Sequence, residues 1–298
     1  MEVLKNLWRA QGHDPRWYQI GALATLLAYG IGWLEFDVSP LTAATILCAT
    51  LLTQGCCTYL KNLPSYDPKS ALISGLSLCL LLRTNSFEWA LAASVLTIGG
   101  KFLLRWDGRH VFNPTNFGLV VTLLTGAGWV SAGQWGAVAF FAFFIACLGS
   151  LVVTRAARGD VTGAFLGSYA ALLFARAWWL GDPLAIPLHQ LQSGALLLFA
   201  FFMISDPKTT PASRRGRILF AFLVAVGAAS VQFLLYRPNG LQWSLAASVL
   251  LVPLINRLFP GASYEWNRPL AHSPSIHEGG VHEGFSGCAR IAPRHSAV

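Results

Sequence analysis

Long apolar runs separated by short polar segments make up most of this chain. Ten runs can be delimited, with ends good to about three residues. They cover residues 18–36, 41–60, 70–82, 87–104, 117–130, 134–153, 163–180, 191–204, 218–236 and 241–258. Most approach the ~20 residues that an α-helix needs to cross a hydrocarbon core of about 30 Å. The pattern predicts an all-α integral membrane protein with ten transmembrane helices in a lipid bilayer.

The positions of Lys and Arg test this number of crossings. If the N-terminus lies in the cytoplasm and each run crosses once, eighteen of the 21 Lys and Arg residues fall on the inner side. Only Arg83 and Arg237 fall on the outer side, and Arg176 lies within a run. Cytoplasmic loops of membrane proteins carry such an excess of positive charge. The distribution therefore predicts a multi-pass protein with both termini in the cytoplasm.

Two of the runs are short, and they occupy matching places in the chain. Residues 70–82 and 191–204 contain 13 and 14 residues and are the third and eighth runs. Each has a Ser-Gly pair near its start. The pairs are Ser74-Gly75 and Ser193-Gly194. With five runs in each half, the second half is inverted relative to the first, and short segments at matching places of inverted halves indicate a binding site near the bilayer midplane.

These patterns divide the chain into segments with different roles. Residues 1–17 are expected to lie along the inner membrane interface, with apolar side chains on one face and Lys and Arg on the other. Residues 18–259 form the ten-span domain, with the first repeat over 18–130 and the second over 134–259. Residues 260–298 are rich in Ser, Gly and His, a composition that predicts a disordered tail.

Composition agrees with a membrane protein and excludes other classes. Only 11% of the 298 residues are charged, against about 25% in soluble domains. The mean hydropathy is +0.53. The net charge of +8 is spread between the apolar runs and forms no basic domain, which argues against nucleic-acid binding. The six cysteines make no CxxC pair, so we expect no metal site.

The segment FNPTNFG, residues 112–118, is the first candidate binding site. Pro114 has no N–H, and asparagine side chains offer both an amide and a carbonyl. A helix that begins at Pro114 or Thr115 would point its positive end toward an anionic or carbonyl-bearing group. An ordinary N-cap with proline in the first turn explains the same residues, and the two interpretations are compatible. The candidate ligand contacts are Phe112, Asn113, Pro114, Thr115 and Asn116.

The segment FFMISDPKTTP, residues 201–211, is the second candidate. It leaves a short apolar run and carries two prolines, which indicates a broken helix. Backbone groups freed by such a break must be satisfied by protein or by a ligand, because lipid offers no hydrogen-bond partners. A helix cap in an inner-surface loop is the alternative. The candidate contacts are Asp206, Pro207, Thr209 and Thr210.

Other chemistry has little support. No catalytic triad, phosphate-binding loop, HExxH motif or carboxylate pair is present. The predicted spans hold almost no ionisable residues apart from Arg176, whereas proton-driven carriers generally need some. This scarcity argues against a classical proton-driven carrier.

The two segments also point to a family. FNPTNFG after Gly108-Arg109-His110, together with FFMISDPKTTP, resembles the signature segments of the RnfD/NqrB membrane subunits of bacterial ion-translocating electron-transport complexes. The resemblance covers roughly residues 15–258. It implies a ten-span fold of two inverted five-helix repeats related to urea-transporter architecture. It also implies a place in the bacterial plasma (inner) membrane, with other membrane redox subunits as partners.

The resemblance implies a flavin, but this chain departs from the family at the attachment site. In the family, one FMN is esterified to a threonine in an outer loop between the fifth and sixth spans. The corresponding segment here, residues 128–134, contains no threonine. The sequence DVTGAF at residues 160–165 lies on the inner side by charge and has Phe165 where the acceptor would stand. We therefore expect no covalent FMN, and non-covalent riboflavin or FMN as the cofactor. The chain resembles a shortened branch of the family, such as the stand-alone forms found beside enediyne-biosynthesis-like genes.

Three functions follow from these observations. The first is an electron-transfer membrane subunit with a non-covalent flavin or quinone. The second is a transporter or channel for a small neutral or aromatic solute, with the two Ser-Gly pairs lining the path. The third is a structural subunit that docks a redox partner.

Overall fold

The structure is a computed structural model that describes residues 14–34, 36–106, 108–131, 138–262 and 264. These residues lie within one compact unit, Met1–Trp266. The predicted interface segment is described only from residue 14, and nearly all of the predicted tail lies outside the described residues. Both therefore stay predictions.

Each of the ten predicted runs contains helix, so the helical class is confirmed. The first half holds α2 Pro15–Gly32, α3 Pro40–Leu60, α4 Pro68–Leu81, α5 Phe87–Leu103 and α6 Pro114–Leu124. The second half holds α7 Val138–Arg155, α8 Gly159–Leu180, α9 Ala185–Leu191, α10 Gly194–Leu198, the π-helix η1 Phe199–Met203, α11 Arg214–Phe233, α12 Gly240–Ser248, the 3₁₀-helix η2 Val249–Leu251 and α13 Val252–Leu258. Four two-residue strands, β1 Leu82–Arg83, β2 Arg105–Trp106, β3 Arg109–His110 and β4 Trp129–Val130, pair antiparallel as β1 with β4 and β2 with β3.

Fewer helices have the length and composition of a membrane span than the ten runs predict. Among the described residues, three helical stretches are long and apolar enough to span a bilayer: Pro40–Leu60, Arg214–Phe233 and Gly240–Leu258. A fourth is obtained if α9 and the stretch Gly194–Met203 count as one span, although they are bent by 48°. The ten crossings and the inverted repeat are therefore not confirmed by length and composition.

Asx and Ser residues followed by proline set the starts of four helices. Asp14, Ser39, Asp67 and Asn113 each accept a hydrogen bond from a backbone N–H in the first turn, and a proline follows each of them. This is the arrangement expected of an N-cap with proline at the first helical position. As a result, α2, α4 and α6 begin two or three residues before the apolar runs do.

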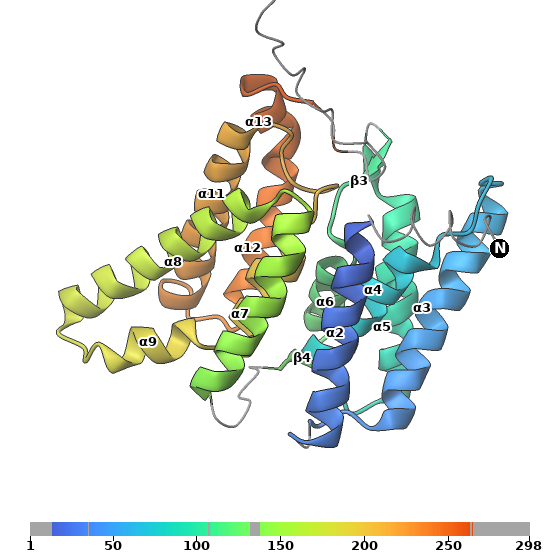
Figure 1. Ribbon diagram of the computed structural model, residues 1–298, viewed down its shortest axis with the longest axis horizontal. Coiled ribbons are helices and arrows are strands. Elements are labelled where there is room, and N and C mark those ends of the chain that lie inside the picture. The colour runs from blue at the N-terminus through green and yellow to red at the C-terminus, as the bar shows by residue number, and fades with distance from the viewer. Residues whose placement is uncertain (1–13, 35, 107, 132–137, 263, 265–298) are drawn as a thin grey trace, which may run out of the picture. The chain divides into compact units, whose positions relative to one another are not determined.

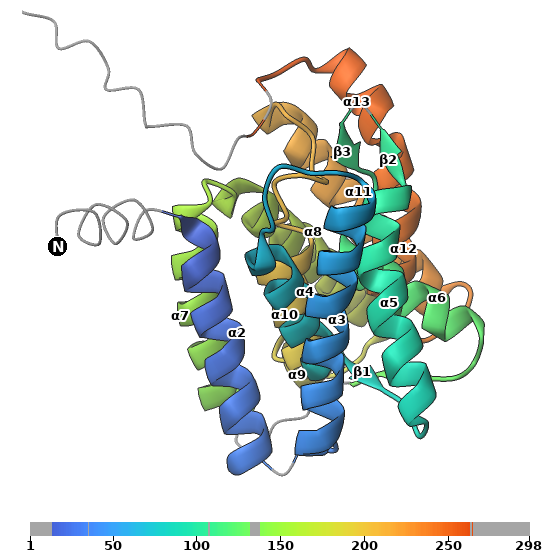
Figure 2. The same cartoon turned by 90° about the vertical axis from the view of Figure 1, so that its right-hand side faces the viewer.

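The helices form two groups that meet along α2, α6, α7 and α12. In the first group α3 packs on α4 and α5, α5 on α6, and α2 on α4; in the second, α11 packs on α8 and α12. Contacts of α2 with α7 and of α6 with α12 join the groups, and Figures 1 and 2 show α2 and α7 side by side. The η1 turn lies at the centre, with Phe199, Ala200, Phe202 and Met203 all buried.

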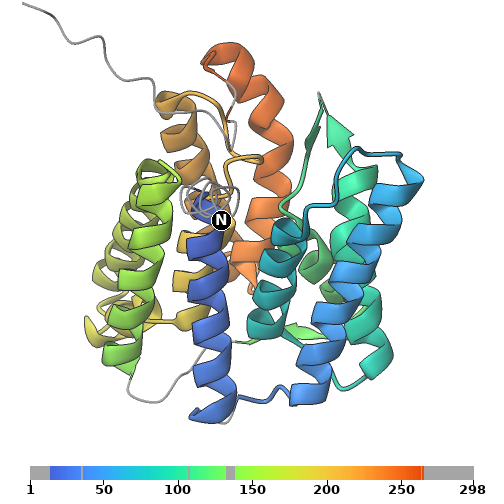
Figure 3. The same ribbon diagram turned by 45° about the vertical axis from the view of Figure 1, so that its right-hand side comes forward.

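Most helices run between two opposite ends of the unit. β2 and β3 lie at one end, which we call the β3 end, together with the starts of α2 and α4 (Figures 1 and 3). α9 and β4 lie at the other, which we call the β4 end. By the charge distribution, the β3 end corresponds to the predicted cytoplasmic side.

Close contact between α5 and α6 gives a direct test of this packing. A Cβ added at Gly118 would lie 1.8 Å from Thr97 Oγ1 and 3.1 Å from the carbonyl oxygen of Ala93. Thr97 is buried and β-branched, so it has little freedom to turn away. We expect Gly118→Ala to lower the free energy of unfolding by about 1–3 kcal/mol, the usual cost of overpacking.

Thermal unfolding in mild detergent measures this effect, and Gly167→Ala in α8 is the matched control. A Cβ at Gly167 meets no atom within 4 Å. Since glycine within a helix is less stable than alanine by roughly 0.5–1 kcal/mol, the control should be neutral or stabilising. Equal effects of the two substitutions would contradict the α5–α6 contact.

Candidate functional site

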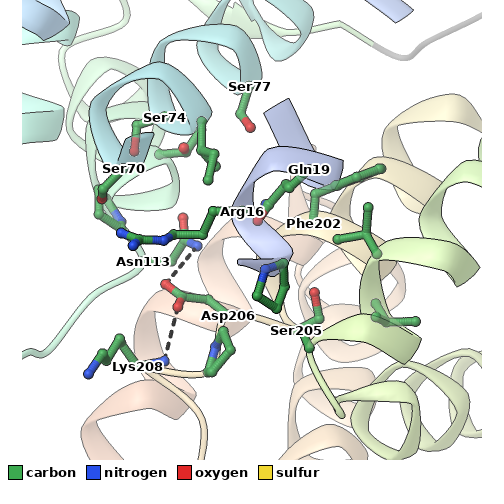
Figure 4. A pocket seen from close by; sticks show the side chains of 18 of the residues that line it. Arg16, Gln19, Ser70, Ser74, Ser77, Asn113, Phe202, Ser205, Asp206 and Lys208 are labelled. Atoms are coloured by element: carbon green, nitrogen blue, oxygen red, sulfur yellow. Dashed lines mark hydrogen bonds between the residues drawn. The ribbon is translucent and has the colours of Figure 1, made fainter. Parts of the chain in front are cut away.

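The two proline-interrupted segments meet in the structure. Asn113 caps α6, and its Oδ1 accepts a hydrogen bond from the backbone N–H of Asn116 at 3.1 Å. Its Nδ2 donates to the carbonyl oxygen of Met203 at 3.3 Å and to Asp206 Oδ2 at 3.4 Å (Figure 4). Two segments that are far apart in the sequence thus share one hydrogen-bonded group.

Asp206 is the centre of this group. Its Oδ1 accepts from the backbone N–H of Lys208 at 3.0 Å, and its Oδ2 lies 3.4 Å from His110 Nε2 as well as close to Asn113. Burial alone would raise the pKa of the carboxyl group, but hydrogen bonds from His110, Lys208 and Asn113 outweigh it and hold that pKa below its usual value. Asp206 is therefore expected to be ionised.

A cavity of about 80 Å³ adjoins these residues toward the β3 end. Hydroxyl groups of α4 line one side, and the start of α6 and the 202–208 segment line the rest (Figure 4). The hydroxyl and amide residues that line it are Gln19, Ser70, Ser74, Ser77, Asn113, Thr115 and Ser205. This volume holds several water molecules, but it is below the roughly 300 Å³ at which small-molecule pockets begin.

A network of mostly buried charges meets the same cavity at Arg16. Arg16 donates through Nε to Asp14 Oδ1 at 3.0 Å and through Nη2 to Asp14 Oδ2 at 2.8 Å, and its Nη1 contacts Asp67. Lys69 Nζ donates to Asp14 Oδ2 at 2.8 Å. Burial raises the pKa of Asp14, but its bonds to Arg16 and Lys69 more than compensate and lower that pKa to about 2. The network ties the start of α2 to the start of α4.

A repeated tripeptide positions the polar residues around this cavity. This repeat was not identified from the sequence. An Asx-Pro-X unit occurs at each of the four segments that converge here. The four units are Asp14-Pro15-Arg16, Asp67-Pro68-Lys69, Asn113-Pro114-Thr115 and Asp206-Pro207-Lys208. In each, the Asx side chain accepts a backbone N–H two or three residues later. The recurrence of Asp-Pro-Arg/Lys in the sequence could have indicated these residues as a site. Each unit turns the chain and presents a cation or a hydroxyl group.

Other predicted site residues support the group without lining the cavity. Phe112 packs on Phe117 with ring centroids 5.5 Å apart. The hydroxyls of Thr209 and Thr210 donate to the carbonyl oxygen of Asp206 at 3.4 and 3.0 Å, so they shape its turn. Gly75 is a packing residue, because a Cβ there would lie 2.7 Å from Thr50 Oγ1.

Asn116 connects α6 to α12. Its Nδ2 donates to the carbonyl oxygen of Gln242 at 3.1 Å. Its Oδ1 is buried, and among the described residues no hydrogen-bond donor reaches it. A buried amide oxygen without a partner is costly, which marks this atom as able to accept a hydrogen bond from water or a ligand.

The second Ser-Gly pair lies in a different place. Ser193 and Gly194 begin α10, and Ser193 lines a second cavity of about 460 Å³ that also contacts β4 and α9, at the β4 end. Its lining combines Arg237, His189 and several apolar residues with five amide side chains, which belong to Gln190, Gln192, Gln232, Asn239 and Gln242. The serines of the two Ser-Gly pairs thus line separate cavities rather than one, and neither glycine lines either of them.

Possible metal ligands do not gather in the described part of the chain. No group of three His, Cys, Asp or Glu side chains there is close enough to hold an ion.

Comparison with known proteins supports the resemblance seen in the motifs. The model of the NQR2, RnfD, RnfE family matches residues 121–265, a range that contains the Asp206 segment. Three proteins, each named as a subunit of an ion-translocating oxidoreductase complex, are similar to this chain. The one from Escherichia fergusonii is 32% identical over 152 residues, which cover 50% of this chain and 40% of that protein. The one from Erwinia tasmaniensis is 33% identical over 147 residues, with 48% and 37% covered, and the one from Escherichia coli O1:K1 is 34% identical over 151 residues, with 50% and 40% covered.

The match thus spans about half of this chain and about two fifths of the curated relatives. Over residues 121–265 the chain matches the NQR2, RnfD, RnfE family, which confirms the family resemblance; this range contains the second proline-containing segment, 201–211, and not the first, 112–118.

Proposed function

We propose that this chain is a multi-pass membrane subunit of an ion-translocating electron-transfer assembly, in which it binds a flavin or quinone non-covalently. The observation that carries the proposal is the match to the NQR2, RnfD, RnfE family over a range that includes Asp206. The relatives are named as subunits of an oxidoreductase complex. Other membrane redox subunits are accordingly its proposed partners.

Exposed aromatic residues support the membrane part of the proposal. Trp33, Trp178 and Trp179 follow or end helices that run toward the β4 end, while Tyr59 and Trp106 lie toward the β3 end. Their exposed fractions are between 64% and 83%. Tryptophan and tyrosine are enriched at both membrane–water interfaces. We propose ten crossings in two inverted repeats, 18–130 and 134–259, with the β3 end and both termini on the cytoplasmic side of a bacterial plasma membrane.

The chemistry of the β3-end group suits a flavin ring. The pyrimidine edge of a flavin presents both donors and acceptors, and the group offers the amide of Asn113 and the carboxylate of Asp206. A bound flavin would supply reversible electron acceptance. The 80 Å³ cavity is too small for such a ring as it stands, so binding requires side chains such as Arg16 and Phe202 to move.

We propose further that any FMN is not covalently attached. Residues 128–134 offer no threonine as acceptor, and Phe165 stands after the inner DVTGA sequence. Phe165 is fully buried and packs on Tyr169 and Phe199, which makes that inner segment part of the core.

Purification in mild detergent tests the proposal. We expect a visible flavin spectrum that survives washing and that disappears from the protein after acid denaturation, because the ligand is held by hydrogen bonds alone. Denaturing gels should show no fluorescent band. A fluorescent band would contradict the non-covalent proposal, and a colourless protein that takes up neither added riboflavin nor quinone would contradict the redox proposal.

A second function is favoured by one observation. The cavity of about 460 Å³ at the β4 end has the size of a small-molecule site, and its lining combines apolar residues, five amides and Arg237 without a carboxylate. A transporter or channel for a small neutral or aromatic solute would need such a site on the outer side. A colourless protein that carries solute flux in liposomes would support this function. A protein that binds no flavin or quinone and carries no solute flux would favour the third function, a structural subunit that docks a redox partner.

A further inference from the structure

A second cavity, of about 540 Å³, lies at the β3 end, and we call it the basic cavity. Residues of β3, of the turn after η1 and of α13 line it, and Figures 1 and 2 show β3 and α13 at the same end of the unit. His110 and Lys208 line both this cavity and the one of about 80 Å³, whereas Asp206 lines only the smaller one. The volume of the basic cavity lies within the range of small-molecule sites.

Three cationic side chains converge on the basic cavity. Arg109, Lys208 and Arg257 line it, and no carboxylate is among the described residues that do so. Lys208 Nζ donates to the carbonyl oxygen of Tyr264 at 3.2 Å, and this partner is neutral. Arg257 is exposed, and no Asp or Glu of the described chain lies within the 4.0 Å of an ion pair with it. A hollow lined by charges of one sign concentrates counter-ions, so this cavity attracts anions.

Other cations of the structure are held by carboxylates instead. Arg217 Nη2 lies 2.6 Å from Asp160 Oδ2, and Arg16 Nη2 lies 2.8 Å from Asp14 Oδ2. Those pairs tie helices together and leave little positive charge for a ligand. The basic cavity differs because its three cations come from segments far apart in the sequence and meet around an open volume.

The rest of the lining suits a phosphate group attached to an apolar body. Asn256 Oδ1 accepts a hydrogen bond from the backbone N–H of Ala212 at 2.9 Å, so the amide group of Asn256 is fixed with its Nδ2 available to donate. Val249 and Val252 add an apolar wall. Trp106, which also lines the cavity, is 64% exposed, as is common for tryptophan at a membrane–water interface.

We propose that the basic cavity binds a phosphate group, carried either by the headgroup of an anionic phospholipid or by a soluble phosphorylated compound. Arg109, Lys208 and Arg257 supply the charge, and arginine can hold two phosphate oxygens at once. Basic pockets between membrane helices on the cytoplasmic side are known to bind anionic headgroups. The proposal goes beyond the proposed function, because it requires neither a flavin nor a quinone and involves no electron transfer.

Calorimetric titration of the full-length protein in neutral detergent tests this proposal. The probes are dioctanoyl phosphatidylglycerol and glycerol 3-phosphate, which share a glycerol phosphate group and differ in the acyl chains. Dioctanoyl phosphatidylcholine, whose headgroup has no net charge, is the comparison, and the ionic strength is kept constant because salt screens such contacts. We expect phosphatidylglycerol, glycerol 3-phosphate or both to bind more tightly than phosphatidylcholine.

Substitutions locate the binding. Each cation near a membrane surface contributes roughly a factor of five in affinity for an anionic group, so Arg257→Gln should weaken binding about fivefold and Arg109→Gln with Arg257→Gln about twentyfold. Arg215→Gln is the matched control and should stay within about a factor of two. Arg215 is an exposed cation in the first turn of α11 that is not among the residues lining the cavity.

The outcomes distinguish the two sources and can overturn the proposal. Binding of phosphatidylglycerol without glycerol 3-phosphate identifies a lipid headgroup, and similar affinities for both identify a soluble phosphorylated compound. Binding of neither probe, equal binding of phosphatidylcholine, or wild-type affinity in the double variant would overturn the proposal and leave the proposed function intact. If the double variant does not fold, the single substitution at the exposed Arg257 decides the question.

Discussion

Replacing Arg16 by methionine is expected to lower the free energy of unfolding by about 3–5 kcal/mol, the usual result of removing one partner from a buried ion pair. Arg16 and Asp14 are both nearly inaccessible, with side chains 10% and 6% exposed. The substitution leaves Asp14 with Lys69 as its remaining cation and frees Asp67 from α2. Because the network joins the starts of α2 and α4, the wall of the cavity should loosen as well. Chemical denaturation in mild detergent measures the loss.

A second substitution separates charge from packing. Adding Asp14→Asn to Arg16→Met removes the buried carboxylate that then has only Lys69 as a partner, and we expect it to recover at least half of the lost stability. Acid titration gives an independent readout. The pKa of Asp14 lies at about 2, below the ordinary 3.8, so its stabilising contribution is present above about pH 4 and is lost as the pH falls toward 2. In Arg16→Met this acid-sensitive contribution should shrink, and an unchanged stability at about pH 6 would show that the network is not stabilising.

Replacing Asp206 by alanine is expected to weaken riboflavin binding at least tenfold while the protein still folds. The carboxylate holds the Asn113 amide, the His110 ring and the Lys208 N–H in one arrangement. Each partner left unsatisfied in a buried site costs about 1–3 kcal/mol, and about 1.4 kcal/mol corresponds to a factor of ten in affinity. Fluorescence titration of detergent-purified protein with riboflavin gives the dissociation constants.

Two further variants make this experiment selective. Asp206→Asn keeps an oxygen that can accept from Lys208 but removes the charge, so its affinity should lie between those of wild type and Asp206→Ala. Asp182→Ala is the matched control, because Asp182 lies 3.4 Å from Arg176 in the loop after α8, away from the cavity. Loss of expression in Asp206→Ala with unchanged affinity of the surviving protein would show that Asp206 serves only as a turn cap.

Helix positions could be predicted because they depend on local properties. The apolar runs located most helices of the two halves to within a few residues, since burial in lipid or in a core requires a continuous stretch of apolar side chains. They missed α9, which lies between two runs, and the run over 117–130 extends beyond the end of α6 at Leu124. Other errors lie at the starts. The run that begins at residue 117 corresponds to a helix that begins at Pro114, because a polar cap, which hydropathy does not detect, sets the first turn.

Part of the site could also be predicted, because some of its residues belong to local sequence patterns. Proline and asparagine at the start of α6 and the Asp-Pro turn after η1 are visible in the sequence, and both turned out to border one cavity. The sequence did not reveal that α4 contributes Ser70 to that cavity while Ser193 lines another, since this depends on which helices pack together. His110 illustrates the same limit: it looks like an isolated histidine, and only the β2–β3 turn brings it to Asp206.

The amino-acid sequence by itself determined the helical class, the order of the runs, the bias of positive charge toward one side and the family resemblance. Each of these follows from composition or from residues close together in the chain. Tertiary structure decided which segments share a cavity, how large that cavity is, and which of the many basic residues are neutralised. Arg16 and Lys101 are alike in sequence as cations near the predicted inner surface. One meets carboxylates and the other meets a serine and a glutamine, because helices distant in sequence supply those partners.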